Sequence, residues 1–170
     1  RQMCIRDRLT KRQRKYPIFN NAYMMTGSHH LYNYLPTKHE KWLTMIKQEI
    51  IDSGLIVDIL NAKTMEDVFR LLQGCSFLGS FLAYQYTIDM NYSPYINFSE
   101  NDFVKAGIGA IRGIKKCFLC YGNKCEDAIW YVKEHFNDLQ KRYGYTSFHP
   151  LLGHEPTPVS YTHLTLPTNS

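Results

Sequence analysis

The sequence predicts an all-α fold, a compact multi-helix domain, on three kinds of observation. Three stretches, Thr37–Glu40, Thr64–Asp67 and Ser99–Asp102, carry the helix-capping signature of a hydroxyl residue followed three positions later by an acid. Apolar residues then recur at helical spacing. Gly54 and Gly74 stand where the first two periodic stretches end, as glycine does at helix C-termini.

The expected helices follow in chain order. The first covers residues 37–54, and a shorter second one covers residues 64–74. Residues 76–90 are expected to form a buried central helix, because aromatic and aliphatic side chains recur there every three or four positions. These side chains are Phe77, Phe81, Tyr84 and Ile88. A last helix is expected over residues 126–143, with Gly144 as its stop.

A glycine-rich motif, Gly107-Ile-Gly-Ala-Ile-Arg-Gly113, is the most informative stretch of the chain. The third cap leads into it, and we expect helix to resume at Ile114, with Ile108 and Ile111 also on the buried side. The motif is therefore expected to be a hairpin between two helices. Glycine reaches positive φ at little cost and lets another molecule approach the main chain.

Positive charge surrounds this motif, and unpaired N–H groups at the start of the following helix favour an anion. We therefore expect the motif to contact phosphate groups of DNA, a kind of contact that carries affinity without reading sequence. The residues concerned are Gly107, Gly109, Ala110, Gly113, Lys105, Lys115 and Lys116, together with Arg112. The alternative is a plain glycine turn between packed helices, with lysines that are only solvated.

The two ends of the chain differ from the rest. Residues 1–8 resemble the translation of one strand of a sequencing-library adapter, and residues 158–168 resemble the translation of its complementary strand. Segments of this kind are excluded from fold reasoning. We expect adapter-derived artefacts at 1–8 and 158–170, and between them, at 9–157, a single helical domain that is truncated at its C-terminal end.

Without those ends, the formal charge falls from +5 to about +3, because three arginines and one aspartate are removed. Such a mild excess does not by itself predict nucleic-acid binding. The sequence contains no apolar run long enough to span a bilayer, and its visible start is no signal peptide. The simplest expectation is a soluble intracellular protein with no membrane partner.

Two segments together resemble a known family. Phe81–Tyr92 is an aromatic stretch with an acid, Asp89, near its end, and Ala106–Cys117 contains the glycine motif in the arrangement of a helix-hairpin-helix element. Both are similar to a phage-associated, DNA-glycosylase-like domain linked to hypermodified thymine. That family is the helical domain of hydroxymethyl-deoxyuridine DNA kinase, or alpha-glutamyl/putrescinyl thymine pyrophosphorylase. The similarity covers most of residues 16–148, although Ile108 replaces a proline and Met24 an arginine found in relatives.

The resemblance implies a transfer reaction on DNA. A hydroxymethyluracil is activated with phosphate groups, and an amine such as an amino acid or a polyamine then displaces pyrophosphate at the exocyclic carbon. Asp89 would act as a general base on the incoming ammonium or orient it, and Arg112 would neutralise the departing phosphates. Tyr86 and Tyr92 are favoured for a base pocket, since they lie near Asp89. The alternative for Asp89 is a helix-end residue bonded to the local backbone.

The resemblance also implies partners. They are DNA, an amine donor and a P-loop kinase, since this chain has no G-x-x-x-x-G-K-[ST] motif of its own. The expected location is the cytoplasm of a bacterial or phage-infected cell. Relatives continue beyond the equivalent of residues 148–157, which implies that part of the active site is missing here. Two classes stay open: an enzyme domain of hypermodification, and a non-catalytic DNA-binding module that works with a separate kinase.

Two further patterns are weaker. Asp127 would suit a DNA base glycosylase, but acids in the first turn of a helix also favour the helix dipole. Cys117, Cys120, Cys125 and His135 are weak candidates for a metal site, because only the first pair has C-x-x-C spacing and no second pair follows. We expect reduced cysteines, with Cys75 in the core, and neither a metal nor another cofactor.

Overall fold

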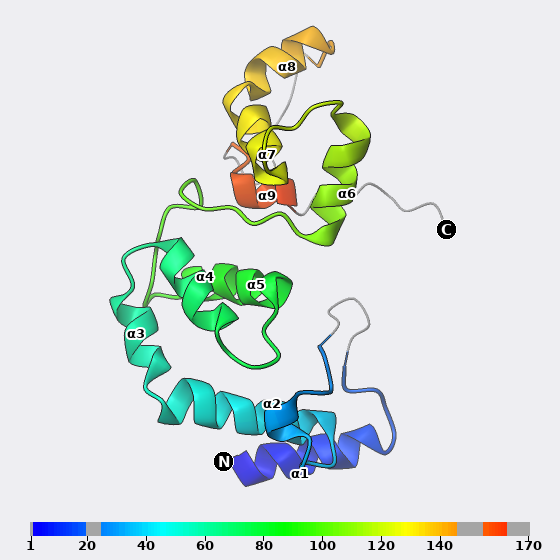
Figure 1. Cartoon of the computed structure of the whole chain (residues 1–170), viewed down its shortest axis with the longest axis vertical. Coiled ribbons are helices and arrows are strands. Elements are labelled where there is room, and N and C mark those ends of the chain that lie inside the picture. Colours follow the sequence, from blue (N-terminus) through cyan, green and yellow to red (C-terminus); the bar gives the residue numbers. More distant parts are fainter. Residues whose placement is uncertain (1, 20–24, 146–154, 163–170) are drawn as a thin grey trace. The chain divides into compact units, whose positions relative to one another are not determined.

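The computed structural model describes residues 2–19, 25–145 and 155–162, and every regular element within them is a helix (Figure 1). The all-α prediction is therefore confirmed. By its internal contacts the chain divides into two units, Arg1–Asn97 and Phe98–Ser170. Met24 and the segment 146–154, which entered the comparison with relatives, lie outside the described residues.

The first unit is a succession of short helical elements. They are α1 (Gln2–Gln13), the 3-10 turn η1 (His30–Tyr32), α2 (Lys38–Met45), the π-helix η2 (Ile46–Asp52), α3 (Leu55–Asn61), α4 (Met65–Gln73) and α5 (Ser80–Asn91). Helices α4 and α5 lie side by side (Figure 1). The core of this unit includes Met45, Ile59, Met65, Val68, Leu72, Leu82, Ala83 and Ile88. Burial of these apolar side chains is the main force that packs such short helices together.

The first two predicted helices are confirmed at their caps. The Thr37 hydroxyl accepts from the amide of Glu40 and donates to its carboxylate at 2.7 Å. Thr64 and Asp67 form a reciprocal capping box, with distances of 3.1 and 3.0 Å. The first helix runs on as η2 and ends before Gly54, which has a left-handed φ of 81°. A helix that was not predicted, α3, follows directly.

The predicted central helix begins later than expected, at Ser80 instead of residue 76, and ends at Asn91. Residues 76 and 77 lie in a turn, where Phe77 has a left-handed φ of 66°, and residues 78 and 79 are irregular. Phe81 is 42% exposed, so its predicted burial is wrong. The buried side of α5 is centred on Ala83 and Thr87, because that side faces the core.

The predicted hairpin at residues 107–113 is wrong. Ser99–Asp102 forms a turn without a following helix, and α6 (Ile108–Cys117) begins six residues earlier than predicted. Gly107 is its N-cap in an extended conformation, and the other two glycines of the motif are helical. Ala110 and Ile114 lie one turn apart and are both buried, which requires a helix through the glycines.

The second unit contains α6, α7 (Cys125–Glu134), α8 (Phe136–Arg142) and α9 (Pro158–Thr162). Helices α6, α7 and α9 pack together (Figure 1). Their buried cluster is Val104, Ala106, Ala110, Ile114, Ala128 and Ile129. The helix predicted over residues 126–143 is broken at His135 between α7 and α8, and Gly144 stops it with a φ of 76°. Ile108, expected on the buried side, is 68% exposed.

Some described elements fall in the segments predicted to derive from an adapter. They are the first part of α1 and the whole of α9, whose Val159 is 4% exposed. The adapter origin of these segments stays a prediction. None of the helices in the described ranges is both long enough and apolar enough to cross a membrane.

Candidate functional site

The first unit contains an open cavity of about 670 Å³. Its walls are mostly apolar and come from α1 to α5, with Trp42, Met45, Ile46, Ile59 and Leu72 among the lining side chains. Cavities of this size and character are typical of sites for small organic ligands. The helices of this unit therefore leave room for a molecule of about the size of a nucleotide.

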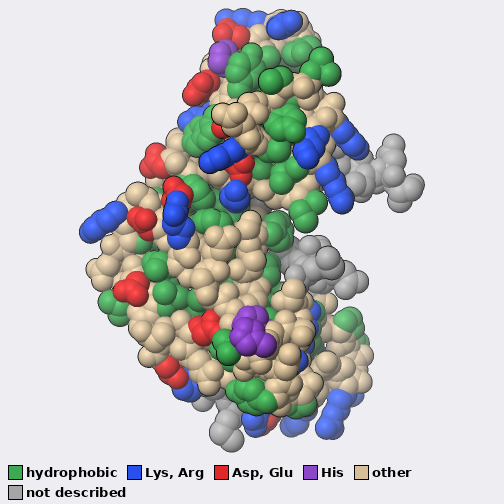
Figure 2. All heavy atoms as spheres, viewed as in Figure 1, with side chains coloured by type: hydrophobic (Ala, Val, Ile, Leu, Met, Phe, Trp, Pro, Cys, Tyr) green, Lys and Arg blue, Asp and Glu red, His purple; other side chains and the backbone are tan. Residues whose placement is uncertain are grey.

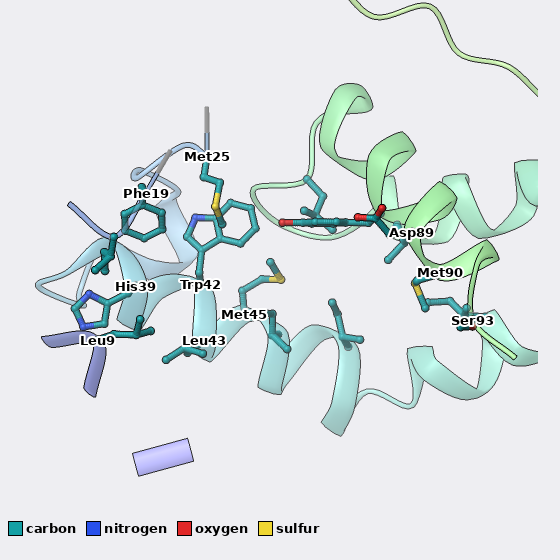
Figure 3. Close-up of a pocket in the computed structure, with 17 residues that line it drawn as sticks. Leu9, Phe19, Met25, His39, Trp42, Leu43, Met45, Asp89, Met90 and Ser93 are labelled. Atoms are coloured by element: carbon teal, nitrogen blue, oxygen red, sulfur yellow. The ribbon is translucent and has the colours of Figure 1, made fainter. Parts of the chain in front are cut away.

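Asp89 lines this cavity and is itself exposed, so its carboxylate is accessible at the cavity's edge. Figure 3 shows Asp89, Met90 and Ser93 on one side, with Phe19, Trp42 and His39 across from them. Tyr86, one turn before Asp89, also lines the cavity. Burial, followed by the nearby negative charge of Asp89, raises the pKa of Tyr86, which keeps its phenol protonated. Two of the predicted site residues are thus brought together.

Tyr92 does not share that position. It follows the last turn of α5, is 68% exposed, and is not among the residues that line the cavity. Arg112, the second residue predicted to be catalytic, belongs to α6 in the other unit. Asp89 and Tyr86 are therefore the predicted residues that share one pocket.

His39 supplies a polar atom in this apolar wall. Its side chain is only 2% exposed, and its Nε2 lies 3.0 Å from the Thr10 hydroxyl oxygen. The Thr10 hydroxyl donates its proton to the Arg6 carbonyl. In the contact between Thr10 and His39, Nε2 is therefore the donor and the hydroxyl oxygen accepts. Nδ1 is then the basic nitrogen, and it is buried with no hydrogen-bond partner among the described residues. Such an atom is costly unless something donates to it.

Glu49 holds one wall of the cavity in place. Its carboxylate accepts from the Tyr32 hydroxyl and from the Ser76 amide, each at 2.6 Å. Burial would raise the pKa of Glu49, but these hydrogen bonds outweigh it and lower the pKa. Glu49 lies in η2, and Ile46 and Ile50 of the same π-helix line the cavity. Irregular turns of this kind often occur at functional sites.

In the second unit, most of the predicted phosphate-binding residues lie on α6, with Gly107 as its N-cap and Lys105 just before it. No side chain caps the start of this helix at Gly107, so its first amides are left to other partners. Gly109 is exposed, Gly113 is half-buried and Ala110 is buried in the core. Within the motif, the exposed backbone therefore lies around the first turn of α6, near Gly107 and Gly109.

Arg112, Lys115 and Lys116 are exposed, and the two lysines lie three and four residues after the arginine, which places both near it on one side of α6. Figure 2 shows lysine and arginine side chains gathered over this helix. Lys105 differs, because its Nζ lies 3.0 Å from Oε1 of Glu126. Burial raises the pKa of Glu126, but hydrogen bonds from Lys105 and the Ala106 amide outweigh it and lower the pKa. Lys105 is thus partly neutralised.

Asp127 is occupied as a helix cap. Its Oδ2 accepts from the amides of Asn123 and Lys124 at 2.9 and 3.0 Å. These bonds satisfy the backbone at the start of α7, the local role that acids at this position commonly have. The geometry gives no support to Asp127 as the acid of a glycosylase.

The cysteines of the second unit are free: Cys117 and Cys120 are exposed, and Cys125 is half-buried. His135 Nδ1 contacts the Tyr131 carbonyl at 3.0 Å, and its ring stacks on that tyrosine. Within the described ranges, no three His, Cys, Asp or Glu side chains form a group that could hold a metal ion. Cys75 is buried, as predicted.

Sequence reasoning missed His39 and Glu49. His39 sits inside the capping box that predicts a helix start, and nothing in the pattern indicates that its ring turns inward. Glu49 lies between Ile46 and Ile50 on the apolar side of a predicted helix, and this position is its one local signal. A charged residue on such a side needs buried partners, and these come from distant parts of the chain.

The comparison with protein families gives one match. The family described as "5-hmdU DNA kinase, helical domain" matches residues 2–164, nearly the whole chain. Searches of the curated proteins and of the solved structures gave no significant match. The resemblance inferred from Phe81–Tyr92 and Ala106–Cys117 is thereby confirmed. The chain belongs to the family of the 5-hmdU DNA kinase helical domain, which ties it to the modification of hydroxymethyluracil in DNA.

Proposed function

We propose that this chain is the domain that handles phosphorylated hydroxymethyluracil in DNA during thymine hypermodification. The observation that carries the proposal is Asp89 at the edge of an apolar cavity, beside Tyr86, in a member of this family. A base inside a duplex is not accessible to such a cavity. The modified nucleotide would have to leave the stack, as it does for other enzymes that act on bases.

The walls of the cavity suit a base. Trp42 and Tyr86 offer aromatic surface, and base–aromatic stacking contributes about 1–3 kcal/mol per base. His39 also lines the cavity. Together these features support a flat, aromatic ligand.

The proposed reaction replaces pyrophosphate by an amine. The amine nitrogen forms a bond to the exocyclic carbon of the base, and the bond between that carbon and the pyrophosphate oxygen breaks. The electron pair of the broken bond leaves on pyrophosphate. Asp89 takes the proton released by the nitrogen, or holds the ammonium in position before it is released. The amine donor is a polyamine or an amino acid.

For the second unit we propose phosphate binding. The amides of the uncapped first turn of α6 would donate to a phosphate oxygen, in place of the hairpin that the sequence suggested. Arg112 would neutralise phosphate charge, a task for which its guanidinium is suited by its paired donors. Lys115 and Lys116 would add sequence-independent affinity for DNA, and Lys105 less, because Glu126 already pairs with it.

One alternative has an observation in its favour. The exposed basic side of α6 is sufficient for DNA binding without any chemistry in the cavity. The chain would then be a non-catalytic module that presents DNA to a separate P-loop kinase. This alternative predicts binding but no transfer.

The test uses the full-length protein, an amine, and a duplex that contains one pyrophosphorylated hydroxymethyluracil. With putrescine or glutamate as the amine, we expect an aminated nucleoside in the digested DNA, measured by mass spectrometry. Asp89→Asn should abolish it and leave the dissociation constant for DNA within about twofold, because phosphate contacts carry that affinity. Asp58→Asn, which changes an exposed aspartate of α3, is the matched control and should retain transfer.

The outcomes separate the two candidates. Binding without transfer by the unchanged chain would favour the non-catalytic module. Full transfer by Asp89→Asn would remove Asp89 from the mechanism. A chain that does not bind the duplex at all would exclude both.

A further inference from the structure

Leu119 is the feature that the proposed function does not use. Its relative exposure is 109%, the highest among the exposed large hydrophobic residues of the described ranges. It lies in the loop 118–124, between α6 and α7. Single exposed apolar residues are ordinary on protein surfaces. Leu119 differs in being fully exposed although the aromatic residues on either side, Phe118 and Tyr121, are partly buried.

The loop is anchored on both sides of Leu119. Phe118 packs against the core cluster of this unit, and its amide donates to the Ile114 carbonyl at 2.9 Å. Tyr121, two residues after Leu119, packs against the same cluster. Because Phe118 and Tyr121 are held inward, the two residues between them, Leu119 and Cys120, are presented outward. The side chain is thus a fixed protrusion.

The end of the loop is also fixed. Gly122 has a left-handed φ of 77°, and Asp127 Oδ2 accepts from the amides of Asn123 and Lys124. A carboxylate that ties two successive amides of a loop limits the loop's movement. The protrusion at Leu119 is therefore supported from the start of α7 as well.

The surroundings of Leu119 are cationic. Lys115 and Lys116 lie in the last turn of α6 directly before it, Arg112 lies one turn earlier, and Lys124 ends the loop. All four side chains are exposed. Clustered cations around an apolar protrusion match a polyanion that has apolar faces inside it, which is the chemistry of a base-paired duplex.

We propose that Leu119 is a wedge that enters the base stack of DNA while the basic side of α6 holds the phosphates. The inference rests on the proposed function, because a base that is bound outside the duplex must first be unstacked. Proteins insert leucine and similar side chains between base steps, and this offsets the cost of unstacking. Leu119 acts on the position of the base and takes no part in the transfer.

A protein partner is the competing occupant of such a protrusion. Interface centres are typically depleted of charged residues, and lysines in particular are scarce there. Leu119 instead has two lysines, three and four positions before it, and another lysine five positions after it. This charge pattern favours DNA.

The experiment uses the full chain and a duplex with 2-aminopurine next to one hydroxymethyluracil. Unstacking raises the fluorescence of 2-aminopurine, and fluorescence anisotropy of a labelled end measures binding separately. We expect the unchanged chain to bind and to raise the fluorescence. Leu119→Ala should lose the fluorescence rise and keep its dissociation constant within about twofold, because the phosphate contacts remain.

Two variants serve as controls. Leu119→Met should restore the fluorescence rise, because it keeps an apolar side chain that can enter the stack. Leu60→Ala removes an exposed leucine of α3 and should behave as the unchanged chain. Since both leucines are exposed, the unfolding temperature should be unaffected by either alanine.

The outcomes distinguish the wedge from the proposed function. An equal fluorescence rise in Leu119→Ala would overturn the wedge alone. Binding by the unchanged chain without any rise would do the same and would favour a protein partner for Leu119. Absence of binding would overturn the proposed function, and the wedge with it.

Discussion

Glu49 shows how a single carboxylate supports the cavity. Its two oxygens accept from Tyr32 in η1 and from Ser76 in the turn before α5. It therefore ties together three segments that surround Trp42 and Phe77, whose rings stack with centroids 5.3 Å apart. Hydrogen bonds to a charged acceptor are among the stronger ones in proteins, about 1.5–3 kcal/mol each.

Glu49→Gln should destabilise the protein by about 1.5–3 kcal/mol at neutral pH, since the charged acceptor is lost. The lowered pKa means that the folded state favours the carboxylate, so this stabilisation is present above the ordinary value of 4.5. It is lost as the pH falls through the lower folded-state pKa. Urea unfolding at pH 7 and near pH 3 should show a gap between variant and unchanged chain that narrows in acid.

Glu66→Gln is a suitable control for this measurement. Glu66 pairs with Arg70 on the exposed side of α4, and such surface pairs contribute only about 0–1 kcal/mol. The same loss for Glu49→Gln at both pH values would contradict the role given to its charge.

At the scale of elements, α6 is a helix with glycines inside it. Each interior glycine costs about 1 kcal/mol relative to alanine. Burial of Ala110 and Ile114 against α7 offsets that cost. Gly109 and Gly113 therefore do not form the turn that the sequence predicted. In a helix they differ from other residues only in lacking a side chain.

Gly113→Ala tests this interpretation. An added Cβ at Gly113 meets nothing within 4 Å, so we expect the variant to be more stable by about 0.5–1 kcal/mol in thermal unfolding. Gly122→Ala should do the opposite, because Gly122 has a positive φ and its Cβ would lie 2.6 Å from Asp127 Oδ2. If Gly113→Ala instead destabilises the chain, α6 does not tolerate a side chain there.

At the scale of the whole molecule, the chain has two packed units and a non-helical stretch between α5 and α6. Tyr95 in this stretch is 77% exposed. Exposed, irregular backbone is where proteases cut first. Limited digestion with chymotrypsin should therefore cleave early at Tyr95, as identified by mass spectrometry of the fragments.

The matched control for this digestion is Tyr95→Ser, which should slow the cut. Tyr84 in α5 is only 2% exposed and should resist cleavage. Early cleavage inside α4 or α5 would show that the first unit opens more readily than its buried core implies.

Local structure was predicted well where all the residues that form it lie within one turn of the chain. Thr37 with Glu40 and Thr64 with Asp67 form the caps that their spacing indicated, and Gly54 has the left-handed backbone expected of a helix stop. Each of these contacts spans only a few residues. Their geometry is therefore set by backbone sterics and hydrogen bonding within the segment.

The family and the all-α class could be read from the sequence, because caps, helical spacing and short motifs are local properties of the chain. Packing decided the rest. Residues 107–113 were predicted to form a hairpin, but α6 begins there, with Ala110 and Ile114 buried. In α5 the buried side includes Ala83 and Thr87, so Phe81 is exposed. The cavity beside Asp89, the support from Glu49 and the exposure of Leu119 depend on partners far away in sequence, which no local pattern records.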